Sequence, residues 1–175
     1  MAIIKVPWIQ LPKTEYKQLK NGTKGVVFKL SPQYVGKILY AVDGEDYWLR
    51  DDDKAYEELS YEENINRILY EEKIGNVPKP IGVEKLDLYN TTYPTYIMEY
   101  IQDLPHGDKI INHYDQYTAE NLVKKEVYKA SNINVFPGKD YLHPWNYFYD
   151  KNKMIVRLID FGKWTSGDIM TSPYA

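Results

Sequence analysis

The stretch Leu158-Ile159-Asp160-Phe161-Gly162 carries the sharpest chemical signal in the sequence. A short hairpin is predicted just before it, because Tyr147–Tyr149 and Met154–Ile159 flank the turn Asp150-Lys-Asn-Lys153. Asn146 immediately precedes this hairpin, fourteen residues ahead of Asp160. Carboxylate and amide oxygens are hard ligands of the kind that magnesium takes, so Asp160 and Asn146 are the candidate metal ligands.

The composition describes an ordinary soluble globular protein. The chain has 175 residues, of which 43% are hydrophobic and 27% are charged, and its formal net charge is −3. The 25 acidic residues outnumber the 22 basic ones, which form no basic run, so no nucleic-acid partner is expected. With no cysteine, no signal peptide and no apolar run near the roughly 20 residues of a membrane span, a cytoplasmic protein without membrane contact is expected.

The pattern of the rest of the chain predicts an α+β fold. In chain order the predicted elements are a strand Gly25–Leu30, a turn at Ser31-Pro32-Gln33, a strand Tyr34–Val42, a reversal at Asp43-Gly44, a helix over 52–73 stopped by Gly75 and Pro78, strands Ile81–Leu88 and Thr95–Ile101 around an Asn90-Thr-Thr loop, and a helix from Thr118 toward Ala130. The chain becomes polar and irregular after Ile101, which predicts two lobes over 1–101 and 102–175.

Glycines at the first turn predict a backbone that approaches phosphate oxygens closely. Gly22, Gly25 and Val27 match the last two glycines and the valine of a G-x-G-x-x-G-x-V pattern, whereas Lys20 replaces its first glycine. A plain hairpin turn is the alternative interpretation. Lys37 follows on the next strand, where an ammonium could bind nucleotide phosphates, or could lie on an exposed strand face.

A lysine in that role needs a carboxylate from the predicted helix. The helix offers Glu57, Glu58, Glu62 and Glu63. Glu62 is favoured because the apolar residues Ile65 and Leu69, three and seven positions further on, share its face. Glu63 is the alternative, since most glutamates on such a helix are merely solvated.

A third polar segment, Lys139-Asp140-Tyr-Leu-His143-Pro-Trp-Asn146, precedes the hairpin. This segment resembles the catalytic loop of protein kinases, whose spacing implies a catalytic aspartate five residues before the metal-binding asparagine, where Tyr141 stands. Either the loop has a one-residue insertion and Asp140 is that catalytic group, which we favour, or Tyr141 has replaced the aspartate and this assistance is lost. The similar string His106-Gly-Asp108 lacks an asparagine five residues on and is set aside.

Taken in order, these motifs resemble those of the protein-kinase-like superfamily over about residues 18–175, and the Leu142-His143-Pro144 core is similar to that of aminoglycoside and choline kinases. The resemblance implies an antiparallel-sheet N-lobe with one helix, a reduced and mainly helical C-lobe, and Mg-ATP held between them. It also implies that Tyr96–Ile101 is the hinge, with Met98, Glu99 and Ile101 near adenine, although a simple core strand fits this segment equally well.

The resemblance implies a minimal protein Ser/Thr kinase, with Lys37, Glu62 and Asp140 catalytic and Asn146 and Asp160 on magnesium. Its protein substrate or binding partner would lie in the cytoplasm, or in a host cytosol for a viral or effector protein. The alternatives are a pseudokinase-like nucleotide-binding module and, on the Leu-His-Pro core alone, a small-molecule kinase. The residues 171–175 resemble the end of an activation segment, and a partner is expected to replace the supporting helices that family members have after it.

Overall fold

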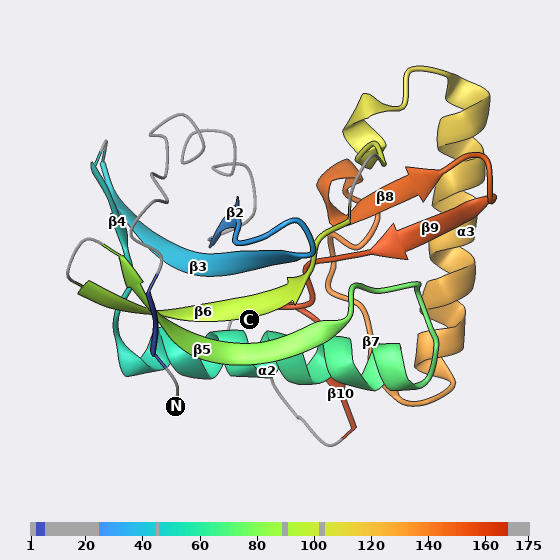
Figure 1. The fold of residues 1–175 in the computed structure, drawn as a ribbon. Helices are drawn as coiled ribbons and strands as arrows, with labels where there is room; N and C mark the ends of the chain where they lie inside the picture. The colour runs from blue at the N-terminus through green and yellow to red at the C-terminus, as the bar shows by residue number, and fades with distance from the viewer. Residues whose placement is uncertain (1–2, 6–24, 45, 89–90, 102–103, 168–175) are drawn as a thin grey trace. The chain divides into compact units, whose positions relative to one another are not determined.

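The computed structural model describes residues 3–5, 25–44, 46–88, 91–101 and 104–167 (Figure 1). These residues fall into two compact units, one within Met1–Glu63 and Ile81–Tyr100 and the other within Asn64–Pro80 and Ile101–Ala175. The α+β fold class is confirmed. None of the helices in the described part of the chain is long and apolar enough to cross a membrane.

The first unit is built on a six-stranded sheet with the order β1-β5-β6-β3-β2, and β4 pairs with β3 beyond it. Its strands are β1 (Ile3–Lys5), β2 (Gly25–Lys29), β3 (Tyr34–Asp43), β4 (Asp46–Leu49), β5 (Pro80–Leu88) and β6 (Thr91–Glu99). Strand β3 is antiparallel to β2, β4 and β6, whereas β1 is parallel to β5. The predicted strands are all present, and β1 and β4 were not predicted.

Local chemistry explains why the long strand β3 forms. Ser31 makes the turn before it, because its hydroxyl accepts hydrogen bonds from the backbone N–H groups of Gln33 and Tyr34. At Gly36 an added Cβ would lie 2.8 Å from the Thr95 side chain, so only glycine fits. The apolar residues of β2, β3 and β5 form one buried cluster of Val26, Phe28, Ile38, Tyr40, Leu86 and Leu88.

Helix α2 (Asp53–Glu71) confirms the helix predicted over 52–73. It begins where the Asp52 carboxylate accepts a hydrogen bond from the Ala55 N–H. It ends in a left-handed cap at Lys73, whose φ is 56°, with Lys73 N–H bonded to Tyr70 O and Ile74 N–H bonded to Leu69 O. The stop therefore comes before Gly75, because this cap already satisfies the last carbonyls of the helix.

The second unit is only partly helical. Besides the last turns of α2, it contains α3 (His113–Ser131), short 3-10 turns at Gly107–Lys109 and Pro144–Asn146, a hairpin of β8 (Tyr147–Asp150) and β9 (Ile155–Leu158), and a pair of β7 (Val135–Phe136) with β10 (Thr165–Ser166). The predicted hairpin is confirmed. Strands β7 and β10 were not predicted.

Two predicted element boundaries are wrong. Helix α3 begins at His113 rather than Thr118, because the Asn112 side chain accepts a hydrogen bond from Tyr114 N–H and caps it there. Strand β6 begins at Thr91, so the two threonines expected in a loop are already strand residues. Threonine is a good strand former, and pairing within the sheet overrides the polar character of this segment.

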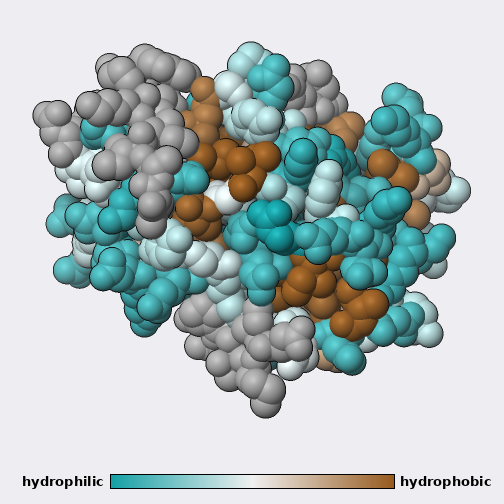
Figure 2. Space-filling model, turned by 60° about the horizontal axis from the view of Figure 1, so that its bottom comes forward, coloured by the Kyte–Doolittle hydropathy of each residue, from teal (hydrophilic) through white to brown (hydrophobic). Residues whose placement is uncertain are grey.

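The face of the molecule drawn in Figure 2 is mixed rather than dominated by one apolar area. Figure 2 shows one face, on which apolar patches are separated by hydrophilic residues. Among the described residues the large apolar side chain most open to solvent is Ile111, which is 95% exposed just before α3. Tyrosines 114, 117 and 128 of that helix are also exposed.

Candidate functional site

In the first unit, strand β3 and helix α2 bring Lys37 and Glu62 together. The Lys37 Nζ lies 3.0 Å from Oε1 and 2.9 Å from Oε2 of Glu62, and the two side chains are 5% and 2% exposed. The apolar face that favoured Glu62 over Glu63 is real, since Ile65 and Leu69 are fully buried. The result is a charged amine fixed at a buried strand position by a carboxylate from the helix.

Packing against Lys37 explains why residue 25 is a glycine, and the sequence did not suggest this explanation. Strands β2 and β3 pair so that an added Cβ at Gly25 would lie 2.6 Å from the Lys37 Cε. A side chain there would push against the stem of the buried lysine, and glycine leaves it in place. Val27 pairs with Lys37 in the register and is 42% exposed. Gly22 and Lys20 lie outside the described residues.

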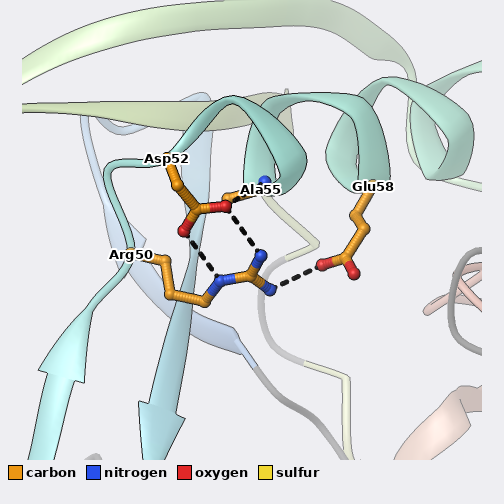
Figure 3. Close-up of polar contacts among 4 residues, drawn as sticks. All are labelled: Arg50, Asp52, Ala55 and Glu58. Atoms are coloured by element: carbon orange, nitrogen blue, oxygen red, sulfur yellow. Dashed lines mark hydrogen bonds and ion pairs between the residues drawn. The ribbon is translucent and has the colours of Figure 1, made fainter.

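A second polar cluster of the first unit, which sequence reasoning missed, lies at the start of α2 (Figure 3). The Arg50 guanidinium binds both carboxylate oxygens of Asp52, at 3.1 and 2.9 Å, and the Glu58 Oε2 at 2.7 Å. The hydrogen bond from Arg50 lowers the pKa of Asp52 to about 2, and the Asp52 side chain raises the pKa of Arg50. The sequence shows that Asp52 and Glu58 lie near the start of the predicted helix, but it does not show that both bind Arg50.

The predicted hinge residues lie at the end of β6. Met98 pairs with Val35 and Glu99 with Tyr34 across the antiparallel register, and both are half-buried. Strand β6 lies between β5 and β3 in the sheet, a position that both interpretations of this segment allow. Ile101 follows the strand and is buried. The contact with adenine stays a prediction.

In the second unit, the β8–β9 hairpin brings Asn146 and Asp160 to the same end. Tyr147 pairs with Leu158, and the next bond outward joins the Ile159 N–H to the Asn146 carbonyl at 3.0 Å. Asp160 follows at once with a φ of 65°, in the left-handed region that few non-glycine residues adopt. Such a conformation persists only where the surroundings enforce it, and it is frequent at functional sites.

The Asn146 side chain also binds the loop that carries Asp140. The Asn146 Nδ2 donates to the Asp140 carbonyl at 2.9 Å, whereas the Tyr141 N–H donates to Gly138 O. The Asp140 Oδ2 lies 3.2 Å from the Lys163 Nζ, a contact that sequence reasoning did not foresee. The structure thus joins Asp140 to Asn146 through the backbone, and to the segment after Asp160 through a partly exposed ion pair.

The oxygens of this region fit a magnesium ion that arrives with a phosphorylated ligand. Because the Asn146 amide nitrogen is directed at Asp140, its Oδ1 would be the atom that binds a cation, and the Asp160 carboxylate would be the second hard ligand. That both residues bind magnesium stays a prediction. In the described part of the chain no three acidic, histidine or cysteine side chains could hold a metal by themselves. Magnesium usually completes its shell with water and substrate phosphates, so two protein ligands suffice.

His106, which was not predicted to be a site residue, packs against the segment that contains Trp145 and Asn146. Its ring is 5.4 Å from the Trp145 ring and 4.1 Å from the Phe148 ring. Burial lowers its pKa, and its Nδ1 is buried without a hydrogen-bond partner among the described residues. Packing of the His106 ring against Trp145 supports the position of that residue, next to Asn146.

Comparison with known proteins gives a structural likeness and no sequence relative. No protein-family model and no curated protein sequence matches the chain. A Rio2 kinase complex with ADP, Mg2+ and phosphoaspartate from Chaetomium thermophilum superposes with a TM-score of 0.56 at 18% identity, over 84% of this chain and 47% of that one. A second Rio2 kinase structure from that organism gives 0.53 at 19% identity, over 82% and 46%.

A third similar structure is WbdD in complex with the kinase inhibitor LY294002. Its TM-score is 0.52 at 16% identity, over 83% of this chain and 32% of that chain. The chain therefore spans less than half the length of each of these proteins. At such low identity the likeness concerns the fold alone. The chain has a protein-kinase-like α+β fold.

Proposed function

We propose that the chain is a phosphotransferase that transfers the γ-phosphoryl group of Mg-ATP to a protein Ser or Thr hydroxyl. The observation that carries this proposal is the buried Lys37–Glu62 ion pair within a protein-kinase-like fold. A buried amine held by a helix carboxylate is suited to binding phosphate oxygens, because its direction is fixed and its charge is screened little by solvent. That the similar Rio2 kinase was crystallised with ADP and Mg2+ supports the choice of ligand.

The roles follow the chemistry of each group. Lys37 binds the α- and β-phosphates and Glu62 keeps it in place. Asn146 and Asp160 would hold magnesium, which supplies charge neutralisation at the phosphates when bound. The acceptor hydroxyl oxygen attacks the γ-phosphorus, the bond to the β–γ bridging oxygen breaks, ADP leaves, and the hydroxyl proton passes to the Asp140 carboxylate. Met98 and Glu99 are proposed to contact the adenine edge.

A direct test combines nucleotide binding with phosphoryl transfer. The purified chain is incubated with γ-labelled ATP and MgCl2, alone and with a general protein substrate such as casein, and Asp160→Ala is treated in parallel. Label on protein that is lost in the variant and without magnesium supports the proposal. Transfer that is unchanged in Asp160→Ala would refute the assigned metal site, and the absence of both binding and transfer would refute the proposed function.

One observation favours a second function, that of a nucleotide-binding interaction module with little turnover. Tyr141 stands at the position five residues before Asn146, and the Asp140 carboxylate is already bound to Lys163. If this ion pair persists with nucleotide bound, the Asp140 carboxylate accepts a proton less readily. The residues proposed to bind phosphate and magnesium are unaffected. Magnesium-dependent ATP binding without transfer would select this function, and label on choline or an aminoglycoside would select a small-molecule kinase instead.

A further inference from the structure

Arg50 makes a second connection between the strand and the helix that carry the Lys37–Glu62 pair. Its backbone N–H donates to the Leu39 carbonyl of β3 at 2.8 Å, and its Nη1 donates to the Glu58 Oε2 of α2 at 2.7 Å. Leu39 comes two residues after Lys37, and Glu58 comes four residues before Glu62, one turn away on the same face of the helix. Arg50 therefore joins β3 to α2 close to the Lys37–Glu62 pair, through its backbone on the strand side and its guanidinium on the helix side, within one unit.

Burial makes the loss of one partner of this connection costlier than in an ordinary surface ion pair. The side chains of Arg50 and Glu58 are only 17% and 8% exposed, so water screens their attraction little. An exposed ion pair contributes little to stability, because solvent screens it. Removing one member of a buried pair, in contrast, leaves its partner as an uncompensated buried charge.

Asp52 fixes the direction of the guanidinium. It accepts from both Nε and Nη2 of Arg50, and its Oδ1 also caps α2 at the Ala55 N–H, 2.9 Å away (Figure 3). One planar fork thus binds the cap of the helix and its second turn at once. A lysine could not make these contacts together, because its ammonium is a point charge without the fork.

We infer that Arg50 is a positioning residue that holds α2 against β3 and thereby keeps Glu62 on Lys37. The inference rests on the proposed function for the meaning of that pair, but its structural content can be measured without any activity. When the Arg50 side chain is lost, Glu58 becomes an unpaired buried carboxylate and the first turns of α2 lose their side-chain link to the residue that is bonded to β3. Glu62 then leaves Lys37, and the Lys37 amine becomes accessible to solvent.

The test measures how fast Lys37 is acylated in the full chain. An amine-reactive ester is applied at pH 8 to wild type, Arg50→Met, Glu58→Gln and the control Lys54→Met, and labelled peptides are quantified against exposed Lys153. Circular dichroism reports folding for each variant. Lys54 suits the control because it is an exposed cation on the first turn of α2, outside the cluster. ATP affinity and transfer rate are measured on the same samples, with Arg50→Lys added to ask whether charge alone restores them.

We expect the Lys37 labelling rate to rise about tenfold or more in Arg50→Met, less in Glu58→Gln, and to stay within about twofold in Lys54→Met. ATP affinity should fall in the same order, and Arg50→Lys should restore little of it. If Arg50→Met does not fold, Glu58→Gln decides. Lys37 that stays protected in the folded variants would overturn the inference. Lys37 that becomes reactive in a chain that never binds ATP would uphold the positioning role and refute the proposed function.

Discussion

The Nζ of Lys37 contacts both carboxylate oxygens of Glu62, at 2.9 and 3.0 Å, with neither side chain more than 5% exposed. Removing one partner leaves the other charge buried and uncompensated, so Glu62→Gln should lower the free energy of unfolding by about 3–5 kcal/mol. Chemical denaturation at neutral pH measures this loss. Glu63→Gln, at the half-buried neighbouring position, is the matched control and should change stability far less.

Replacing both partners separates the structural role of this pair from its functional role. A buried ion pair exchanged for apolar residues of similar size costs little stability, so the double variant Lys37→Met/Glu62→Leu should lie within about 1–2 kcal/mol of wild type. It should nevertheless lose ATP affinity, because no cation is left for the phosphates. Isothermal titration with Mg-ATP measures this. Unchanged affinity in the stable double variant would remove Lys37 from the nucleotide site.

The loop before Asn146 offers two candidates for proton acceptance, and their substitution distinguishes them. Asp140→Asn removes the carboxylate proposed to accept the proton, so it should reduce the transfer rate by about 10²–10⁴-fold. The contact of the Asp140 backbone with Asn146 is kept, so ATP affinity should stay near wild type. Tyr141→Phe keeps the ring and removes only the hydroxyl, and should transfer normally. Single-turnover kinetics with labelled ATP measures both. Normal transfer in Asp140→Asn would exclude it as the proton acceptor.

Helix α2 shows what the sequence could predict about this site. The choice of Glu62 needed only the 3.6-residue period, because Ile65 and Leu69 mark the buried face on which Glu62 also lies. The β8–β9 hairpin could also be predicted, since a polar turn between two runs of alternating apolar and polar residues determines which residues meet at its open end. Patterns that repeat over a turn or a strand pair are local, so a single sequence contains them.

The contacts that the sequence did not predict depend on tertiary structure. Arg50 joins Leu39 to Glu58, and Lys163 reaches Asp140 across 23 residues, and neither follows from any period. Strand β4 is only four residues long and exists because β3 extends far enough to pair with it. The start of α3 at His113 depended on a capping asparagine one residue earlier, whereas the more familiar Thr118 capping pattern lies inside the helix.

Asp52 should make the stability of the first unit sensitive to acid. Its pKa falls from an ordinary 3.8 to about 2, chiefly through the Arg50 hydrogen bond. A carboxylate with a lowered pKa in the folded state contributes stability above pH 3.8, and that contribution is lost as the pH falls toward 2. Because its side chain is 47% exposed, solvent screening keeps the contribution small.

Urea titrations of wild type and Asp52→Asn at a series of pH values between 2 and 6 test this dependence. The difference in unfolding free energy should be constant near pH 6, shrink below pH 4 and approach zero near pH 2. Asp53→Asn, at the next position and outside the Arg50 cluster, is the control. A difference between wild type and Asp52→Asn that persists unchanged to pH 2 would show that the charge of Asp52 is not what the cluster uses.

Asp160 combines an unusual backbone with the proposed metal ligand, and two substitutions separate these properties. At a φ of 65° glycine is unstrained, whereas alanine carries the steric cost of the left-handed region. Asp160→Gly should therefore be more stable than Asp160→Ala by about 1–2 kcal/mol, measured by chemical denaturation. Both variants lack the carboxylate, so both should lose the magnesium dependence of ATP binding in calorimetric titrations with and without MgCl2.

Each outcome bears on a different property. Equal stability of the two variants would mean that this position is not held in a left-handed conformation. Magnesium-dependent binding that survives in both would mean that the carboxylate is not a ligand. Asp160→Asn completes the set, because asparagine tolerates positive φ and keeps one side-chain oxygen while losing the charge. ATP binding in Asp160→Asn should be weak but still magnesium-dependent, whereas Asp160→Gly should show no magnesium dependence. That result would mean that the side-chain oxygen makes the metal contact and that the negative charge gives the contact its strength.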